Sequence, residues 1–150
     1  MNPKIPPPLI AAAIAAAMWA VDRELPSARI ESALLAPLAV ALAVGGLILA
    51  FAAVVAFIRA GTTINPLRPS RATRLITTGV FRLSRNPIYV ADALLLAAWI
   101  VWLGGLFNPL FILIFFWIIQ QWQIVPEELA LRALFGDDYA RYCARVRRWL

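Results

Sequence analysis

The sequence predicts an all-α protein embedded in a membrane, and three observations support this fold class. Of the 150 residues, 63% are hydrophobic and only 15% are charged, and the mean hydropathy is +0.79. The apolar residues gather into runs, and the arginines stand mainly at the ends of those runs. Soluble domains of this size do not carry such an apolar load. We therefore predict one membrane domain, residues 1–150, built as a bundle of about four transmembrane helices with cytoplasmic amphipathic helices at its C-terminal end.

Composition also excludes several classes of function. The formal charge of +6 sits at the ends of apolar runs, so it indicates contact with an anionic leaflet rather than with nucleic acid. The sequence has no histidine, which removes the commonest metal ligand and the usual base of a hydrolase triad. A metal site is not expected. The single cysteine, Cys143, rules out an internal disulfide and suits a reducing compartment.

Residues 1–60 predict two N-terminal spans. The first apolar run, Leu9–Val21, would be only about 20 Å long as a helix, short for a bilayer core of about 30 Å. It is also compatible with the core of a signal peptide. We favour a span, because a second apolar run follows closely and Asp22-Arg23-Glu24 is a poor cleavage context. That second run, Ser32–Ile58, contains Gly45-Gly46, which permits close helix packing or a mild kink.

Residues 61–150 predict a core that contains a helical hairpin over 87–125 and a polar tail. The hairpin consists of two apolar runs, Pro87–Leu103 and Leu110–Val125, joined by a turn rich in Gly, Asn and Pro. The loop before it, residues 59–86, lacks acidic residues and holds six arginines: Arg59, Arg68, Arg71, Arg74, Arg82 and Arg85. This charge predicts a cytoplasmic loop, and therefore both termini in the cytoplasm at the inner (plasma) membrane.

The tail predicts two short helices. The first starts at Pro126 and runs to about Phe135, where Gly136 stops it and Asp137 or Asp138 caps the next. The final helix would carry three arginines on one face, at i, i+4 and i+7: Arg141, Arg145 and Arg148. A basic amphipathic helix of this kind is suited to lying on the inner leaflet or closing over a site.

The stretch Thr78–Tyr89 is the leading candidate for a functional site. Arg82 and Arg85 come just before Asn86-Pro87, a typical helix start, because Asn caps well and Pro is tolerated in the first turn. Two guanidiniums at the mouth of an apolar helix are suited to an anionic or zwitterionic small molecule. A simpler interpretation is that these arginines only mark the cytoplasmic end of a span.

Two groups of acidic residues are the other candidates. Because the hairpin leaves and returns on one side, it should bring the Glu127-Glu128 pair to the arginine loop, with Arg85 and Glu127 within reach of each other, as ligand groups or only as a structural ion pair. Asp92 lies about one turn into the third apolar run. An acid inside a span is costly unless paired or neutralised, so Asp92 is a candidate catalytic or ligand residue, or the partner of a loop arginine.

Three segments together resemble the isoprenylcysteine carboxyl methyltransferase and phospholipid methyltransferase superfamily. They are L-I-T-T-G-V-F-R-L-S-R-N-P-I-Y, the later P-E-E, and F-G-D-D-Y-A-R-Y-C-A-R-V-R-R-W, within about Gly61–Leu150. The resemblance implies a membrane methyltransferase that uses S-adenosylmethionine. It implies cofactor-binding residues at Gly79, Phe81, Arg85, Asn86, Pro87, Tyr89, Glu127, Glu128 and Tyr142. Arg85 and Glu128, together with the intramembrane acid Asp92, are the predicted catalytic residues.

The resemblance leaves the methyl acceptor open. It implies a lipid-like or prenylated acceptor that enters laterally, whose reacting group is a carboxylate, an amine or a thiol. Eukaryotic members have a histidine where Asn86 stands, and many have Gly where Ala91 stands, so a prenylated cysteine is not favoured in particular. The alternatives are a non-catalytic membrane scaffold or transport subunit that retains the fold, and a four-span exporter. No internal repeat supports the exporter.

Overall fold

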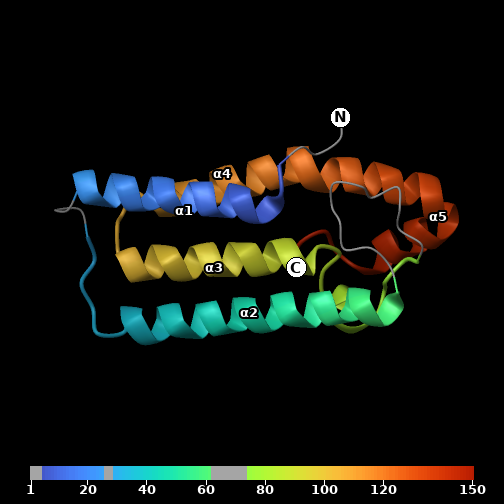
Figure 1. Cartoon of the computed structure of the whole chain (residues 1–150), viewed down its shortest axis with the longest axis horizontal. Coiled ribbons are helices and arrows are strands. Elements are labelled where there is room, and N and C mark those ends of the chain that lie inside the picture. Colours follow the sequence, from blue (N-terminus) through green and yellow to red (C-terminus); the bar gives the residue numbers. More distant parts are fainter. Residues whose placement is uncertain (1–4, 26–28, 62–73) are drawn as a thin grey trace.

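A computed structural model describes residues 5–25, 29–61 and 74–150, and it confirms the all-helical fold class. Long helices run side by side along the long axis of the molecule (Figure 1). The predicted loop residues Arg68 and Arg71 lie outside the described residues. The elements are α1 (Pro7–Glu24), α2 (Leu35–Ala60), the 3-10 turn η2 (Gly79–Arg82), α3 (Pro87–Leu103), α4 (Pro109–Ile119), the π-helical segment η3 (Gln120–Ile124) and α5 (Val125–Arg145).

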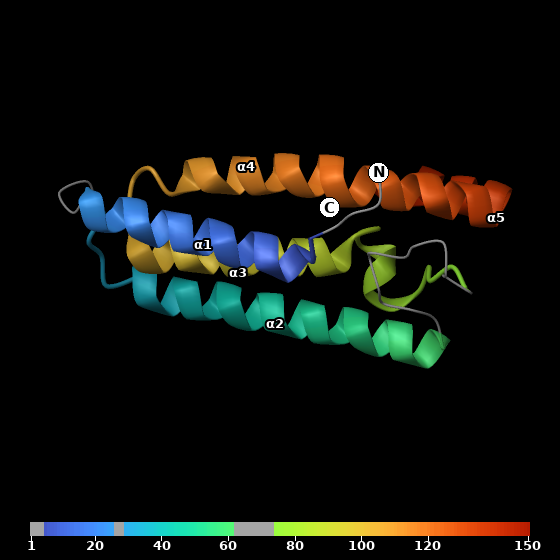
Figure 2. The same ribbon diagram turned by 45° about the horizontal axis from the view of Figure 1, so that its top comes forward.

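Helix α3 is the central element of the bundle. It packs most extensively on α2 and also contacts α1 and α4. Both views place it between α2 and α4, and in Figure 2 it lies partly behind α1 (Figures 1 and 2). The core lies where α1, α3 and α4 meet, around Met18, Phe115 and Ile119, which are fully buried. The α2–α3 contact depends on Gly46, where an added Cβ would lie 3.1 Å from the Ala91 carbonyl oxygen and 3.2 Å from two leucine side chains.

Within the described residues, two helices are long and apolar enough to cross a membrane. They are α2 and the continuous helix from Pro109 to Arg145, whereas α3 is a shorter apolar helix. Only 17% of the most apolar stretch of 18 residues in α2 is buried within the protein. Large side chains of this helix, such as Phe51 and Ile58, are exposed. Apolar exposure on this scale is typical of a surface that faces lipid rather than water.

The join between α4 and α5 differs from the prediction of separate helices. The helix continues from Pro109 through Pro126, because the π turn just before Pro126 already interrupts the regular hydrogen-bond pattern and a residue without an N–H is tolerated there. As predicted, the chain leaves helical geometry at Gly136 (φ 46°, ψ −120°). The prediction of Arg148 on a basic helical face was wrong, because the helix ends at Arg145 and Val146 is extended.

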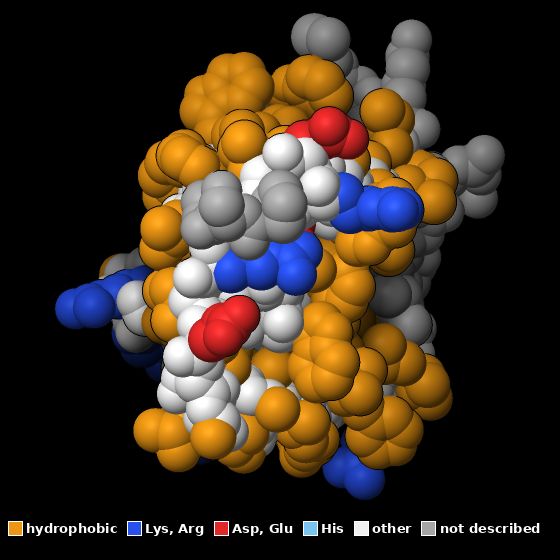
Figure 3. All heavy atoms as spheres, turned by 90° about the vertical axis from the view of Figure 1, so that its left-hand side faces the viewer, with side chains coloured by type: hydrophobic (Ala, Val, Ile, Leu, Met, Phe, Trp, Pro, Cys, Tyr) orange, Lys and Arg blue, Asp and Glu red, His pale blue; other side chains and the backbone are white. Residues whose placement is uncertain are grey.

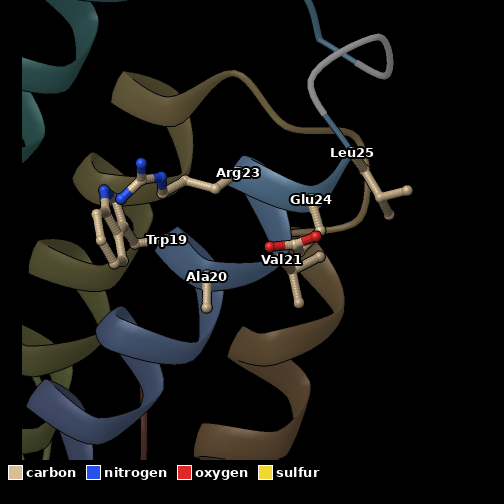
Figure 4. Close-up of a pocket in the computed structure, with 6 residues that line it drawn as sticks. All are labelled: Trp19, Ala20, Val21, Arg23, Glu24 and Leu25. Atoms are coloured by element: carbon tan, nitrogen blue, oxygen red, sulfur yellow. The ribbon is translucent and has the colours of Figure 1, made fainter.

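The end of the bundle opposite the candidate site is closed by polar contacts. Asp22 is only 4% exposed and forms an ion pair with Arg29, and the Ile30 N–H donates to the Gly104 carbonyl (2.8 Å). Figure 3 shows this end, where a few charged side chains stand among hydrophobic ones. The Arg23 guanidinium lies 4.7 Å from the ring centre of Trp19 beside an open pocket of about 700 Å³ (Figure 4). A charged group over an aromatic ring suits a membrane interface.

Candidate functional site

The turn η2 positions Phe81 between α2 and the tail. It begins at Gly79, whose φ of +61° lies in the left-handed region that favours glycine, and an added Cβ there would meet nothing within 4 Å. The ring of Phe81 packs edge-on against Phe57 of α2 with centroids 5.4 Å apart. The Phe81 carbonyl accepts a hydrogen bond from the Tyr142 hydroxyl (2.7 Å), so α5 fixes the turn from the other side.

Arg85 and Glu128 are brought together across the hairpin. The Arg85 Nη2 lies 3.3 Å from Glu128 Oε1, and its Nη1 contacts the Cys143 sulfur. Glu128 also binds Arg148 through two hydrogen bonds of 3.0 and 2.7 Å, an arrangement that raises the pKa of Arg148. Glu128 is only 9% exposed, so this carboxylate is compensated by two guanidiniums rather than by water.

The last residues of the chain form a strap over the start of α3. The Arg85 N–H donates to the Arg147 carbonyl (3.0 Å), and the Arg148 carbonyl accepts from Ser84 Oγ (3.2 Å) and Asn86 Nδ2 (2.9 Å). The expected cap therefore differs in detail. Asn86 does precede α3 and Pro87 opens it, but the Asn86 side chain makes no capping hydrogen bond because it binds the strap instead.

Tyr89 and Glu127 form the second polar contact of the site. The Tyr89 hydroxyl donates to Glu127 Oε1 (2.7 Å), which links α3 to α5 across 38 residues of sequence. Burial is the main reason why the pKa of Glu127 is raised to about 7; the Tyr89 hydrogen bond opposes this rise and the neighbouring Glu128 carboxylate adds to it. A carboxyl group with this pKa changes its charge near neutral pH.

A cavity of about 190 Å³ lies between these groups. Its lining includes six predicted cofactor-binding residues, Phe81, Arg85, Asn86, Pro87, Tyr89 and Glu127, together with Pro7, Pro8, Phe57 and Ile88. The walls are mainly apolar or aromatic, and the charged groups are one guanidinium and one carboxylate. This combination is typical of a site for a small molecule that has both a charged and an apolar part.

Four predicted site residues do not line this cavity. Glu128 forms an ion pair with Arg85, and the Tyr142 hydroxyl donates to the Phe81 carbonyl, but neither side chain lines the cavity. Gly79 lines a separate groove beside α2. Asp92 lies on α3 one turn beyond Tyr89. Its Oδ2 is buried, and no hydrogen bond or ion pair joins it to another described residue, so the structure does not give it an arginine partner.

Sequence reasoning missed several contributors to the site. Pro7, Pro8 and Phe57 lie far from the other lining residues in the sequence, and nothing in their local sequence pattern indicates the cavity. Arg148 was expected on a helical face, yet it binds Glu128. Over residues 5–25, 29–61 and 74–150 there is no cluster of three or more side chains of the types that ligate metal.

The comparisons with known proteins show the family of the chain. The family model described as phospholipid methyltransferase matches residues 35–138, which start at α2 and include η2, the hairpin and both glutamates. A 63-residue uncharacterized protein of Haemophilus influenzae is 46% identical to this chain over its whole length, which covers 42% of the chain. No solved structure matches. The region matched by the family model begins earlier in the chain than the motifs that carry the resemblance, and it ends before Tyr139 and Tyr142. Because the family model matches more than half of the chain, the chain belongs to the phospholipid methyltransferase family.

Proposed function

We propose that the protein is an S-adenosylmethionine-dependent methyltransferase of the membrane that acts on a hydrophobic or lipid-borne acceptor. One observation carries the proposal. Six of the residues that the sequence pattern assigns to the cofactor line a single cavity, although Glu127 lies on α5 and the other five lie within residues 81–89. The same segments lie within the region matched by the family model.

The chemistry of the lining fits this cofactor. Arg85 is suited to its carboxylate, Glu127 to its ammonium or ribose hydroxyls, and the rings of Phe81 and Tyr89 to its adenine or sulfonium. The Arg85 Nε is buried and has no hydrogen-bond partner among the described residues, so a donor is still free on this side chain. The cavity volume of about 190 Å³ is below the roughly 300 Å³ usual for such ligands, so binding requires the site to widen.

When bound, S-adenosylmethionine supplies an electrophilic methyl group. Methyl transfer breaks the carbon–sulfur bond, leaves the electron pair on sulfur and forms one bond to the acceptor, so the protein contributes mainly alignment and exclusion of water. In our proposal Arg85 orients the cofactor and Glu128 positions Arg85. A carboxylate acceptor needs no base, whereas an amine or thiol acceptor must lose a proton, for which Glu127 and Asp92 are the acidic candidates.

The acceptor reaches the cavity from the bilayer in this proposal. Pro7 and Pro8 of α1 and Phe57 of α2 form its apolar side, and both helices pack on α3. An apolar wall between two helices favours a lipid substituent over a soluble acceptor. The proposal adds α1 and α3 to the two candidate spans, and places both termini and the site on the cytoplasmic side of the inner membrane, where the cofactor is available.

Calorimetric titration of S-adenosylmethionine into protein in lipid nanodiscs tests the proposal. We expect saturable binding to the wild type, and loss of binding in Arg85→Ala and Glu127→Gln. Glu24→Gln, which removes an exposed acid at the opposite end of the bundle, should bind normally. Transfer of labelled methyl groups to extracted lipids then identifies the acceptor class. Absence of binding to folded protein, with and without acceptor lipids, would refute the enzyme proposal.

A second candidate is a membrane scaffold that keeps the fold without turnover. The observation that favours it is that Arg85 and Glu128 already bind each other and nearby groups, as structural ion pairs do. A scaffold does not need cofactor affinity. Binding without any methyl transfer to a full panel of membrane lipids would favour this candidate over the enzyme.

A further inference from the structure

A second cavity lies beside the C-terminal end of α2 and shares no lining residue with the cofactor cavity. It has a volume of about 530 Å³ and lies between the last turns of α2 and residues 74–80. We call it the basic groove, because its polar lining consists of Arg59, Arg74, Thr77 and Thr78. The proposed methyltransferase reaction uses none of these four side chains.

The basic groove has the charge of an anion site. No acidic residue is among the described residues that line it, and neither Arg59 nor Arg74 forms an ion pair within the described part of the chain. Both arginines are exposed, so their guanidinium groups are accessible to a ligand. Two guanidiniums with two neighbouring hydroxyls can donate several hydrogen bonds to one phosphate group, and arginine has the planar geometry for this contact.

The groove changes from apolar to basic along α2. Ala52, Val55 and Ala56 form its apolar wall, and Arg59 follows one turn later. The distance along the helix from Ala52 to Arg59 is about 10 Å at 1.5 Å per residue. A surface that is apolar toward the bilayer core and basic at its cytoplasmic edge matches a phospholipid, with its acyl chain below and its phosphate above.

We propose that the basic groove binds the phosphodiester of an anionic phospholipid of the inner leaflet. The phosphate oxygens accept hydrogen bonds from Arg59 and Arg74 at the membrane surface, and an acyl chain lies along the apolar wall of α2. The site is distinct from the cofactor cavity, since the two share no lining residue. The proposal holds whether or not the cofactor cavity performs methyl transfer.

Native mass spectrometry of the detergent-solubilised protein tests this site without any cofactor present. Phosphatidylglycerol and phosphatidylcholine are titrated separately, and inorganic phosphate is added as a competitor. We expect phosphatidylglycerol to bind more tightly than phosphatidylcholine. Arg59→Gln/Arg74→Gln should weaken phosphatidylglycerol binding at least about tenfold, the loss of about 1.4 kcal/mol expected when charge-assisted hydrogen bonds are removed.

The matched control is Arg132→Gln/Arg141→Gln, which removes two exposed arginines from α5 outside the groove and should change binding less than about twofold. Equal weakening in both double variants would show attraction to net charge and overturn the proposal, as would no weakening in the groove variant. Displacement of the lipid by inorganic phosphate at similar concentration would instead assign the groove to soluble anions. Arg59→Lys/Arg74→Lys is a control that keeps the charge of the groove. The melting temperature of each variant shows whether a loss of lipid binding is caused by misfolding.

Discussion

The two adjacent glutamates of the site have different partners and therefore different properties. Glu128 is enclosed by Arg85 and Arg148, which compensate its charge, so it is a structural and positioning group. Glu127 lines the cavity and receives only the hydroxyl of Tyr89, and burial raises its pKa to about 7. Of the two, Glu127 is thus the acid available to a ligand.

This difference predicts a pH dependence of cofactor binding. Because the pKa of Glu127 is about 7, the carboxylate that would bind a cationic group is lost as the pH falls, and affinity should drop about tenfold per pH unit below that value. In Tyr89→Phe the hydrogen bond that lowers this pKa is removed, so the midpoint should move to higher pH. Calorimetry across the pH range measures both midpoints. Tyr142→Phe, whose hydroxyl binds Phe81 instead, should leave the midpoint unchanged.

Arg148 predicts a stability effect that is separate from binding. Arg148→Ala removes two hydrogen bonds from the nearly buried Glu128 carboxylate and should cost roughly 1–3 kcal/mol of unfolding free energy. Arg148→Lys keeps the charge but not the paired geometry, and should recover part of the loss. Melting temperatures in one detergent measure both changes. Equal stability of wild type and Arg148→Ala would show that the contact between the Arg148 side chain and Glu128 contributes nothing to folding.

At the scale of single residues, the sequence predicted the pairing of the loop arginine with the acids of the hairpin. It did so because a hairpin returns both ends to one side, which brings Arg85 to Glu128. It named Glu127 as the acid within reach of Arg85, whereas the ion pair joins Arg85 to Glu128 and Glu127 only lines the same cavity as Arg85. Arg148 was missed because helical spacing was extended past Arg145, where the chain becomes extended.

At the scale of elements, the hairpin was the most predictable part. The range Pro87–Leu103 was expected and observed with the same bounds, because Asn-Pro and Gly-Gly mark its two ends. The predicted break at Pro126 failed, since Pro is tolerated where a π turn already interrupts the hydrogen bonds. Helix α1 begins two residues earlier than the predicted run, at Pro7, where the first turn needs no N–H donor.

The glycine pair of α2 gives an internally controlled prediction for helix packing. An added Cβ at Gly46 would lie 3.1–3.2 Å from α3 atoms, whereas at Gly45 it would meet nothing within 4 Å. Gly46→Leu should therefore destabilise the α2–α3 contact by roughly 1–3 kcal/mol, and Gly45→Ala should be neutral or slightly stabilising. Thermal unfolding in detergent compares the two. Similar effects of both substitutions would contradict the close approach at Gly46.

At the scale of the whole molecule, composition predicted an apolar helical bundle, and the structure has one with its core between α1, α3 and α4. The topology rests on charge asymmetry. The loop over 59–86 holds six arginines without an acid, and the tail from Glu127 holds five more, but the two opposite loops hold only Arg23 and Arg29. The cavity and the basic groove both lie at the arginine-rich end.

This asymmetry predicts which residues are reachable from each side of the membrane. With Cys143→Ser as the background, single cysteines at Leu25 and Arg132 place one thiol at each end of the bundle, and both positions are exposed. A membrane-impermeant maleimide applied to spheroplasts should label the Leu25→Cys variant and leave Arg132→Cys unlabelled until the membrane is broken. Positive loops remain in the cytoplasm because their translocation is disfavoured. The reverse pattern would place the cavity on the side without S-adenosylmethionine and would remove the enzyme proposal together with the topology.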